Sequence, residues 1–132
     1  MLSVDSIRRY CLRKGSLISE DFPFGEETLV IKVAGKVFVL TNITDDIPSI
    51  NLKCDPERAL ELRAQYDSVQ PGYHMNKKHW NTVVIDGSIP DEEVLEMIDH
   101  SYERVIAGLR KADRDRLGGK KGGTARTARS RK

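Results

Sequence analysis

The sequence predicts an α+β fold, a two-layer sandwich in which helices cover one face of an antiparallel sheet of about five strands. The expected elements run helix, three strands, helix, one or two strands, helix, without the regular alternation that builds a parallel sheet. The last helix begins at Pro90 and can extend to Leu117, before Gly118-Gly119. Its broad apolar stripe needs a partner as wide as a sheet. The stripe consists of Val94, Leu95, Ile98, Tyr102, Val105, Ile106 and Leu109.

The first 25 residues predict one helix followed by an irregular loop. Ser3 is a suitable N-cap, apolar residues recur every three or four positions after it, and Gly15 provides a left-handed end. Pro and Gly in the following 19–25 segment disfavour regular structure. We expect Phe22 and Phe24 to anchor this loop on the domain.

The middle of the chain predicts a hairpin, a third strand and a second helix. Residues 28–34 alternate between apolar and polar side chains, Ala34-Gly35 forms a turn, and 36–40 return. A strand is expected at 49–53. Asp55-Pro56-Glu57 then has the cap, first-position proline and early acid of a helix that ends near Tyr66. A further strand is expected at 82–85.

Charge divides the 132 residues into a body and a tail. Residues 1–110 contain 13 Lys and Arg against 18 Asp and Glu, whereas residues 111–132 contain 9 against 2. We therefore expect one α+β domain over 1–117 and a flexible basic tail over 118–132, because the tail has no large apolar side chain to bury.

The two cysteines, Cys11 and Cys54, lack the spacing of a redox or zinc motif. In a chain without a signal peptide we expect two buried thiols and a cytoplasmic location. The longest apolar run, 37–40, is far too short to span a bilayer, so no membrane partner is expected. A monomer is the favoured state.

Two apparent catalytic motifs fail on geometry. Asp99, His100 and Ser101 are consecutive residues of the last helix and point about 100° apart, so they cannot form a hydrolytic triad. We expect them to be solvent-exposed. The glycine- and lysine-rich 118–123 segment follows a helix instead of a strand and lacks the end of a phosphate loop. No catalytic residue is predicted.

Metal binding is not expected either. His74 and His79 lie five positions apart, with no carboxylate or cysteine nearby in sequence, and zinc needs three or four ligands. No metal ligand and no cofactor is predicted.

The segment 71–83 is the most informative part of the chain. So many polar groups could not all be paired in a dry core, so it predicts a loop that leads into a strand. Its candidate nucleic-acid-binding residues, suited to phosphates and to base stacking, are Asn76, Lys77, Lys78, His79 and Trp80. In the alternative interpretation, Trp80 covers the edge of the core and the lysines are only solvated.

The tail is the second candidate for nucleic-acid binding. Its basic residues are Lys120, Lys121, Arg126, Arg129, Arg131 and Lys132, without an acid among them. Such a run binds polyanions non-specifically through counterion release. It can equally be a solubilising extension.

Several short motifs together resemble the MmcQ/YjbR family of small bacterial proteins, over residues 2–109. The motifs are Glu20-Asp-Phe-Pro-Phe-Gly25, Gly35-Lys-Val-Phe38, Leu52-Lys-Cys-Asp-Pro56, residues 71–81 and Ser101-Tyr102. The resemblance implies a frataxin-like (CyaY-like) α+β fold and a DNA-binding role through two β-hairpin wings. It implies no enzymatic activity and no cofactor.

The leading hypothesis is therefore a cytoplasmic, non-enzymatic binding module for DNA, with salt-dependent and non-specific contacts. The alternative is a module for a protein or small-ligand partner that uses the uncovered face of the sheet. An enzyme is the third possibility.

Overall fold

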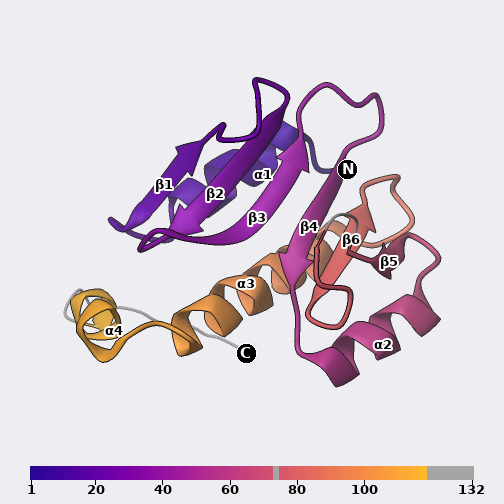
Figure 1. Ribbon diagram of the computed structural model, residues 1–132. Coiled ribbons are helices and arrows are strands. Elements are labelled where there is room, and N and C mark those ends of the chain that lie inside the picture. The colour runs from indigo at the N-terminus through magenta and orange to yellow at the C-terminus, as the bar shows by residue number, and fades with distance from the viewer. Residues whose placement is uncertain (73–74, 119–132) are drawn as a thin grey trace.

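The computed structural model describes residues 1–72 and 75–118. These residues form four helices and six strands, whose arrangement is drawn in Figure 1. They are α1 (Val4–Leu12), β1 (Ile18–Asp21), β2 (Thr28–Val33), β3 (Lys36–Asn42), β4 (Ser49–Lys53), α2 (Pro56–Gln65), β5 (Val69–Pro71), β6 (Trp80–Val84), α3 (Asp91–Ala107) and α4 (Lys111–Gly118).

All strand pairs are antiparallel, in the order β1-β2-β3-β4-β6-β5, which confirms the predicted α+β class. The sheet has six strands instead of about five. The two strands that the sequence did not predict, β1 and β5, are its edges. An edge strand has one neighbour and needs no alternating pattern, and here three of the four residues of β1 are exposed.

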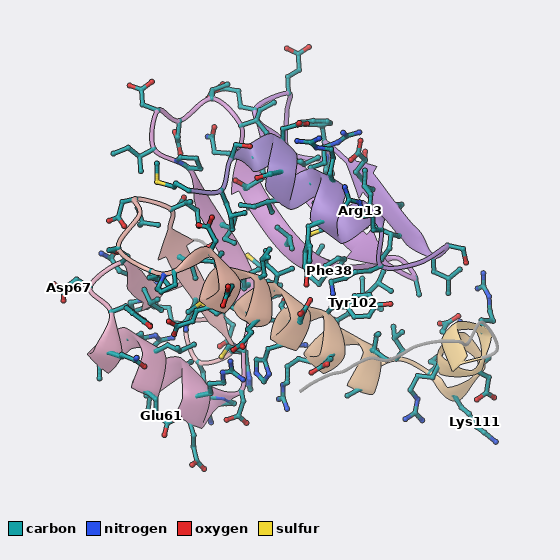
Figure 2. The ribbon with its side chains drawn as sticks, turned by 180° about the vertical axis from the view of Figure 1, so that it is seen from behind. Arg13, Phe38, Glu61, Asp67, Tyr102 and Lys111 are labelled. Atoms are coloured by element: carbon teal, nitrogen blue, oxygen red, sulfur yellow. The ribbon has the colours of Figure 1, made fainter. Side chains whose placement is uncertain are left out.

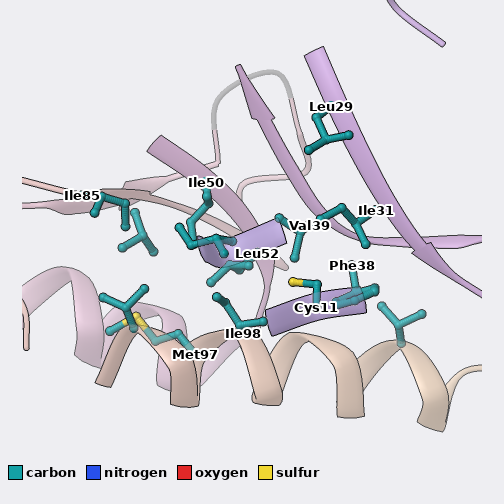
Figure 3. Packing of buried hydrophobic residues seen from close by; sticks show 14 of the residues in the cluster. Cys11, Leu29, Ile31, Phe38, Val39, Ile50, Leu52, Ile85, Met97 and Ile98 are labelled. Atoms are coloured by element: carbon teal, nitrogen blue, oxygen red, sulfur yellow. The ribbon is translucent and has the colours of Figure 1, made fainter. Parts of the chain in front are cut away.

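The core lies between one face of the sheet and the helices. Ile31, Val39 and Leu52 are cross-strand neighbours on that face, and Figure 3 shows their side chains directed toward Ile98 and Met97 of α3. Alternate residues of β4 and β6, such as Asn51 and its partner Thr82, point to the opposite face.

The first and third helices pack on the same face of the sheet, as predicted. Ile7 of α1 and Ile98 of α3 belong to one buried cluster. The Tyr10 hydroxyl donates to Asp99 at 2.8 Å, and the Lys14 ammonium pairs with the same carboxylate. Seen from behind, α1 and α3 both lie in front of the strands (Figure 2).

The two residues predicted to cap helices, Ser3 and Asp55, form their capping hydrogen bonds. Ser3 and Ser6 form a capping box at α1, and the Asp55 carboxylate accepts from the Arg58 amide at 3.2 Å at the start of α2. The last helix does not extend through residue 117, because Gly108 ends α3 and a separate α4 follows. The predicted buried thiols are confirmed, since Cys11 and Cys54 are both buried and free.

The prediction that Phe22 and Phe24 anchor the first loop is wrong. The two side chains are 43% and 72% exposed. The backbone of residues 22–27 is instead held by its own turn and by the neighbouring 43–48 loop, where the Ile43 amide donates to the Glu27 carbonyl at 2.8 Å.

Candidate functional site

The predicted loop lies where β4 ends and β6 begins. Lys53, the last residue of β4, is the cross-strand partner of Trp80, the first residue of β6. One step further, the Cys54 amide donates to the His79 carbonyl at 2.7 Å. The same face of the sheet therefore carries the ammonium of Lys53 next to the indole of Trp80.

Gly72 allows the base of the loop to close tightly. Its amide donates to the Trp80 carbonyl at 2.8 Å. A Cβ atom at this position would lie 2.7 Å from the Cβ of Trp80 and 2.9 Å from its carbonyl oxygen. Only glycine permits this approach between the two sides of the loop.

Arg63 of α2 fixes the loop from the helix side. Its Nε donates to the Asn81 side chain at 2.7 Å, and its Nη2 donates to the carbonyls of Lys77 and Trp80. The Asn81 amide group in turn reaches the Ala59 carbonyl at 3.5 Å. Sequence reasoning did not identify Arg63, because an arginine in the last turn of a helix usually serves only the helix C-terminus.

Asn76 shapes the tip of the loop. Its side-chain oxygen accepts from the Lys78 amide at 2.9 Å and its carbonyl accepts from the His79 amide at 3.2 Å. Lys77 and Lys78 are consequently held on an exposed turn. Trp80 is half-buried and is neither a member of the buried core cluster nor among the residues packed against it. Whether it covers the edge of the core or contacts a ligand stays a prediction.

Three of the five candidate loop residues meet in one open depression. Asn76, His79 and Trp80 line it together with Lys53 and Arg104, and it has a volume of about 330 Å³. Lys77 and Lys78 do not line it. Lys53 and Arg104, which sequence reasoning missed, come from β4 and from the last turn of α3 and have no sequence motif in common with the loop.

Arg104 carries a polar group that its surroundings do not satisfy. Its Nε is buried and has no hydrogen-bond partner among the described residues. An unsatisfied buried donor costs on the order of 1–3 kcal/mol, and proteins retain such groups chiefly where something else uses them. Arg104 is therefore the residue of the depression that most needs an external acceptor.

The cations at this end of the sheet are unpaired. In the described part of the chain, no ion pair involves Lys53, Arg58, Arg63, Lys77, Lys78 or Arg104. Elsewhere, Arg8, Lys14 and Lys32 each pair with an acid. A body with a net negative charge thus concentrates free positive charge at one place.

His100 experiences this positive charge. Its pKa is lowered to about 4, first by burial and then by Arg58 and Arg104. The neutral ring accepts the Asp55 amide at Nε2, at 3.1 Å. The imidazole therefore joins α3 to the start of α2 and is not an acid or base of the depression.

The expectation that Asp99, His100 and Ser101 are solvent-exposed is wrong for Ser101, whereas Asp99 and His100 are half-buried. The three side chains do diverge. Ser101 is fully buried; its hydroxyl donates to the Phe38 carbonyl at 2.6 Å and accepts from the Lys53 amide at 2.9 Å. The Asp99 carboxylate instead accepts a hydrogen bond from the Tyr10 hydroxyl. The three residues connect α3 to α1, to the start of α2 and to β3 and β4, because each polar side chain has a backbone or side-chain partner in these interfaces.

Some candidate residues lie outside the described residues. These are His74 and the tail residues Lys120, Lys121, Arg126, Arg129, Arg131 and Lys132. Within residues 1–72 and 75–118, no group of three or more His, Cys, Asp and Glu is arranged to hold a metal ion. No helix in that part of the chain is long and apolar enough to cross a membrane.

Comparisons with known proteins, by sequence and by structure, both find relatives of this chain. The YjbR family model matches residues 17–104. Uncharacterized protein YbdF of Escherichia coli O157:H7 is 42% identical over 96 residues, which cover 73% of this chain and 79% of that protein. Uncharacterized protein YjbR of Escherichia coli K12 is 32% identical over 108 residues, covering 80% and 88%.

Two crystal structures share the fold. The Deinococcus radiodurans protein DR2400, with family domain DUF419, has a TM-score of 0.83 at 42% identity and covers 96% of this chain and 97% of its own. A Pseudomonas syringae protein has a TM-score of 0.67 at 26% identity, covering 78% and 98%. The matched segment includes the whole sheet, the loop before β6 and Arg104. The chain belongs to the YjbR family.

Proposed function

We propose that the protein is a non-enzymatic binding module for nucleic acid, and that it binds with the end of the sheet where β4 ends and β6 begins. The observation that carries this proposal is the set of unpaired cations at that end. They are Lys53, Arg58, Arg63, Lys77, Lys78 and Arg104, none of which forms an ion pair among the described residues. Lysine and arginine side chains without an acidic partner are the groups that neutralise phosphates and release counterions.

The net charge of the body does not oppose this proposal. Residues 1–110 have five more acids than bases, which would repel a polyanion if the charge were evenly spread. Among the described residues, the bases of this end have no acidic partner, whereas Asp5, Glu20 and Asp99 form ion pairs with Arg9, Arg8 and Lys14 elsewhere. Local potential, not net charge, determines where a polyanion docks.

The loop also offers groups that contact bases. Trp80 is half-buried beside Lys53, so its indole is held in place while part of it remains accessible. A fixed aromatic ring next to a cationic groove is the arrangement with which proteins bind single strands without strong sequence preference. We therefore favour single-stranded over duplex nucleic acid.

The centre of the uncovered face, away from Lys53 and Trp80 at its end, gives less support to the alternative, a protein or small-ligand module. The central polar side chains of this face satisfy each other, because the Thr82 hydroxyl donates to the Asn51 side chain at 2.6 Å. Lys32 and Asp21 are likewise paired across β2 and β1. Groups that already have partners provide little for a ligand.

We also propose a frataxin-like (CyaY-like) fold type, which is consistent with an antiparallel sheet covered by helices. A cytoplasmic location is part of the same proposal and is consistent with two free buried cysteines. The basic tail would add non-specific attraction to the same polyanion.

The test is a salt titration of the full-length chain with a fluorescent single strand. All variants carry glutamine at the six basic tail positions, so that only the body can bind. Lys77→Ala with Lys78→Ala should lower the slope of log affinity against log salt by about 0.7 per lost phosphate contact. Arg9→Ala with Arg13→Ala is the control, since it removes the same charge from exposed sites on α1.

Equal slopes for the two double variants would contradict the proposal for this end of the sheet. Complete loss of binding on neutralising the tail alone would contradict it as well, because the body would then have no affinity of its own.

A further inference from the structure

We propose that the depression lined by Lys53, Asn76, His79, Trp80 and Arg104 binds a phosphate monoester and stacks the attached base on Trp80. This inference rests on the proposed nucleic-acid function and specifies which group the site recognises. The ligand is a terminal nucleotide phosphate, carried either by the end of a strand or by a free mononucleotide.

The polarity of the lining indicates an anion. Lys53 and Arg104 contribute two positive charges, and none of the described residues that line the depression is acidic. Asn76 and His79 add side chains that can donate hydrogen bonds. A neutral or cationic ligand would make no use of these two charges, whereas an anion is attracted by both.

Arg104 indicates an oxyanion with several oxygens. Its Nε is buried and lacks a partner among the described residues, while the residue borders the depression. Guanidinium groups bind phosphate through two parallel N–H donors, one of which is commonly Nε. A rotation of the guanidinium that turns this nitrogen toward the depression would let a phosphate oxygen satisfy a donor that the described residues leave unsatisfied.

Charge and size favour a monoester over an internal phosphodiester. A monoester carries a charge of about −1.5 to −2 at neutral pH, which matches Lys53 and Arg104 together, whereas a diester carries one negative charge. The volume of about 330 Å³ is near the lower limit of small-molecule sites, which begin at about 300 Å³. It suits a phosphate with its sugar better than a length of strand.

Trp80 supplies the contact for the base. It is the cross-strand partner of Lys53, so its ring and the ammonium lie on one face of the sheet. A phosphate held by Lys53 and Arg104 brings the base of the same nucleotide within reach of the indole. Base stacking on an aromatic side chain contributes to affinity without selecting the base.

The experiment uses the intrinsic fluorescence of the full-length protein. Trp80 is the only tryptophan of the chain, so every change in emission reports on this site. The probes are adenosine 5′-monophosphate, adenosine, ribose 5-phosphate and inorganic phosphate. We expect the mononucleotide to bind at least about tenfold more tightly than adenosine, because a charge-assisted bidentate pair exceeds a neutral contact by that much.

Arg104→Gln and Lys53→Met should each weaken mononucleotide binding by about tenfold or more. Arg104→Lys should restore part of the loss, since it keeps the charge but not the paired donors. Lys36→Met is the control, because it removes an exposed lysine that does not line the depression. Circular dichroism of each variant establishes that it is folded.

A second arm compares 5′-phosphorylated with 5′-hydroxyl single strands. A preference for the phosphorylated strand that disappears in Arg104→Gln supports recognition of strand ends. Mononucleotide binding without any strand binding supports the pocket as a site for free nucleotides and contradicts the proposed nucleic-acid function. Strand binding with no effect of the terminal phosphate, of the mononucleotide or of Arg104→Gln overturns the inference and leaves the proposed function intact.

Discussion

The two ends of the sheet differ in both charge and anchoring. Where β4 ends and β6 begins, the loop is tied to α2 by Arg63 and to β4 by the Cys54 amide, and its cations are unpaired. At the other end, the 22–27 and 43–48 loops contain four acids and no base. Phe24 and Ile47 are 72% and 59% exposed there.

This difference shows how an acidic protein can still present a site for an anion. The fold places the ends of distant segments together, so charge that is diluted along the sequence becomes concentrated in space. The basic end, where β4 ends and β6 begins, is also the end whose loop is hydrogen-bonded to α2. A site that must hold a ligand benefits from such anchoring, because less flexibility is lost when the ligand binds.

Loss of the Arg63 hydrogen bonds to the loop should have the largest effect on stability. Arg63→Met keeps the apolar part of the side chain but loses the hydrogen bonds to Asn81 and to the carbonyls of Lys77 and Trp80. We expect the free energy of unfolding to fall by about 2–3 kcal/mol, as for hydrogen bonds to a charged group. Urea unfolding, followed by circular dichroism, measures this.

The emission of Trp80 should move to longer wavelength in the same variant, as the loop loosens. Arg13→Met is the matched control, since Arg13 is exposed, and it should change stability by no more than about 0.5 kcal/mol. Equal effects for both arginines would show that Arg63 does not brace the loop.

Acidification should have the next largest effect on the free energy of unfolding, through His100 at the same end of the sheet. The pKa of His100 is about 4 in the folded protein, below its unfolded value of about 6.5. The unfolded chain therefore takes up the proton first, and the contribution of neutral His100 is complete above pH 6.5 and lost as the pH falls toward 4.

The loss should be about 1–2 kcal/mol after allowance for the partial exposure of the ring. Denaturant midpoints measured from pH 7 to about pH 4 for the wild type and His100→Asn isolate it, because the carboxylates titrate in both proteins. The difference in stability between the two should shrink on acidification. A constant difference would contradict the assignment of His100 as a buried neutral acceptor.

The opposite end should show the smallest effect. Phe24→Ser with Ile47→Ser removes two exposed apolar side chains that lie outside the buried core cluster. Stability should change by less than about 0.5 kcal/mol in thermal or urea unfolding, and mononucleotide binding should be unaltered. A large loss of stability would mean that these loops are held by their side chains after all.

Local signals in the sequence were sufficient for most of the fold. Ser3, Asp55 and the Ala34-Gly35 turn each act through neighbours a few residues away, so the pattern alone identifies them. The edge strands β1 and β5 were missed because apolar and polar residues do not alternate along them. Phe24 was misjudged because hydrophobicity alone does not say which aromatic residues reach the core.

The site could be predicted only in part. Asn76, His79 and Trp80 lie in one stretch whose composition excludes a core segment, and the structure brings them together. Lys53 and Arg104 join them only through the pairing of β4 with β6 and the packing of α3 on the sheet. No local pattern encodes such long-range contacts, and nothing in the sequence distinguishes Arg104 from the other arginines.

Binding of nucleic acid at the end of the sheet where β4 ends and β6 begins can be located by NMR. Backbone amide chemical shifts are recorded while a 5′-phosphorylated single strand is added to the full-length protein. We expect the largest shifts at residues 53–55, 76–80 and around Arg104, with little change at 22–27 and 43–48. Shifts confined to those two acidic loops, or to residues after Gly118, would contradict it.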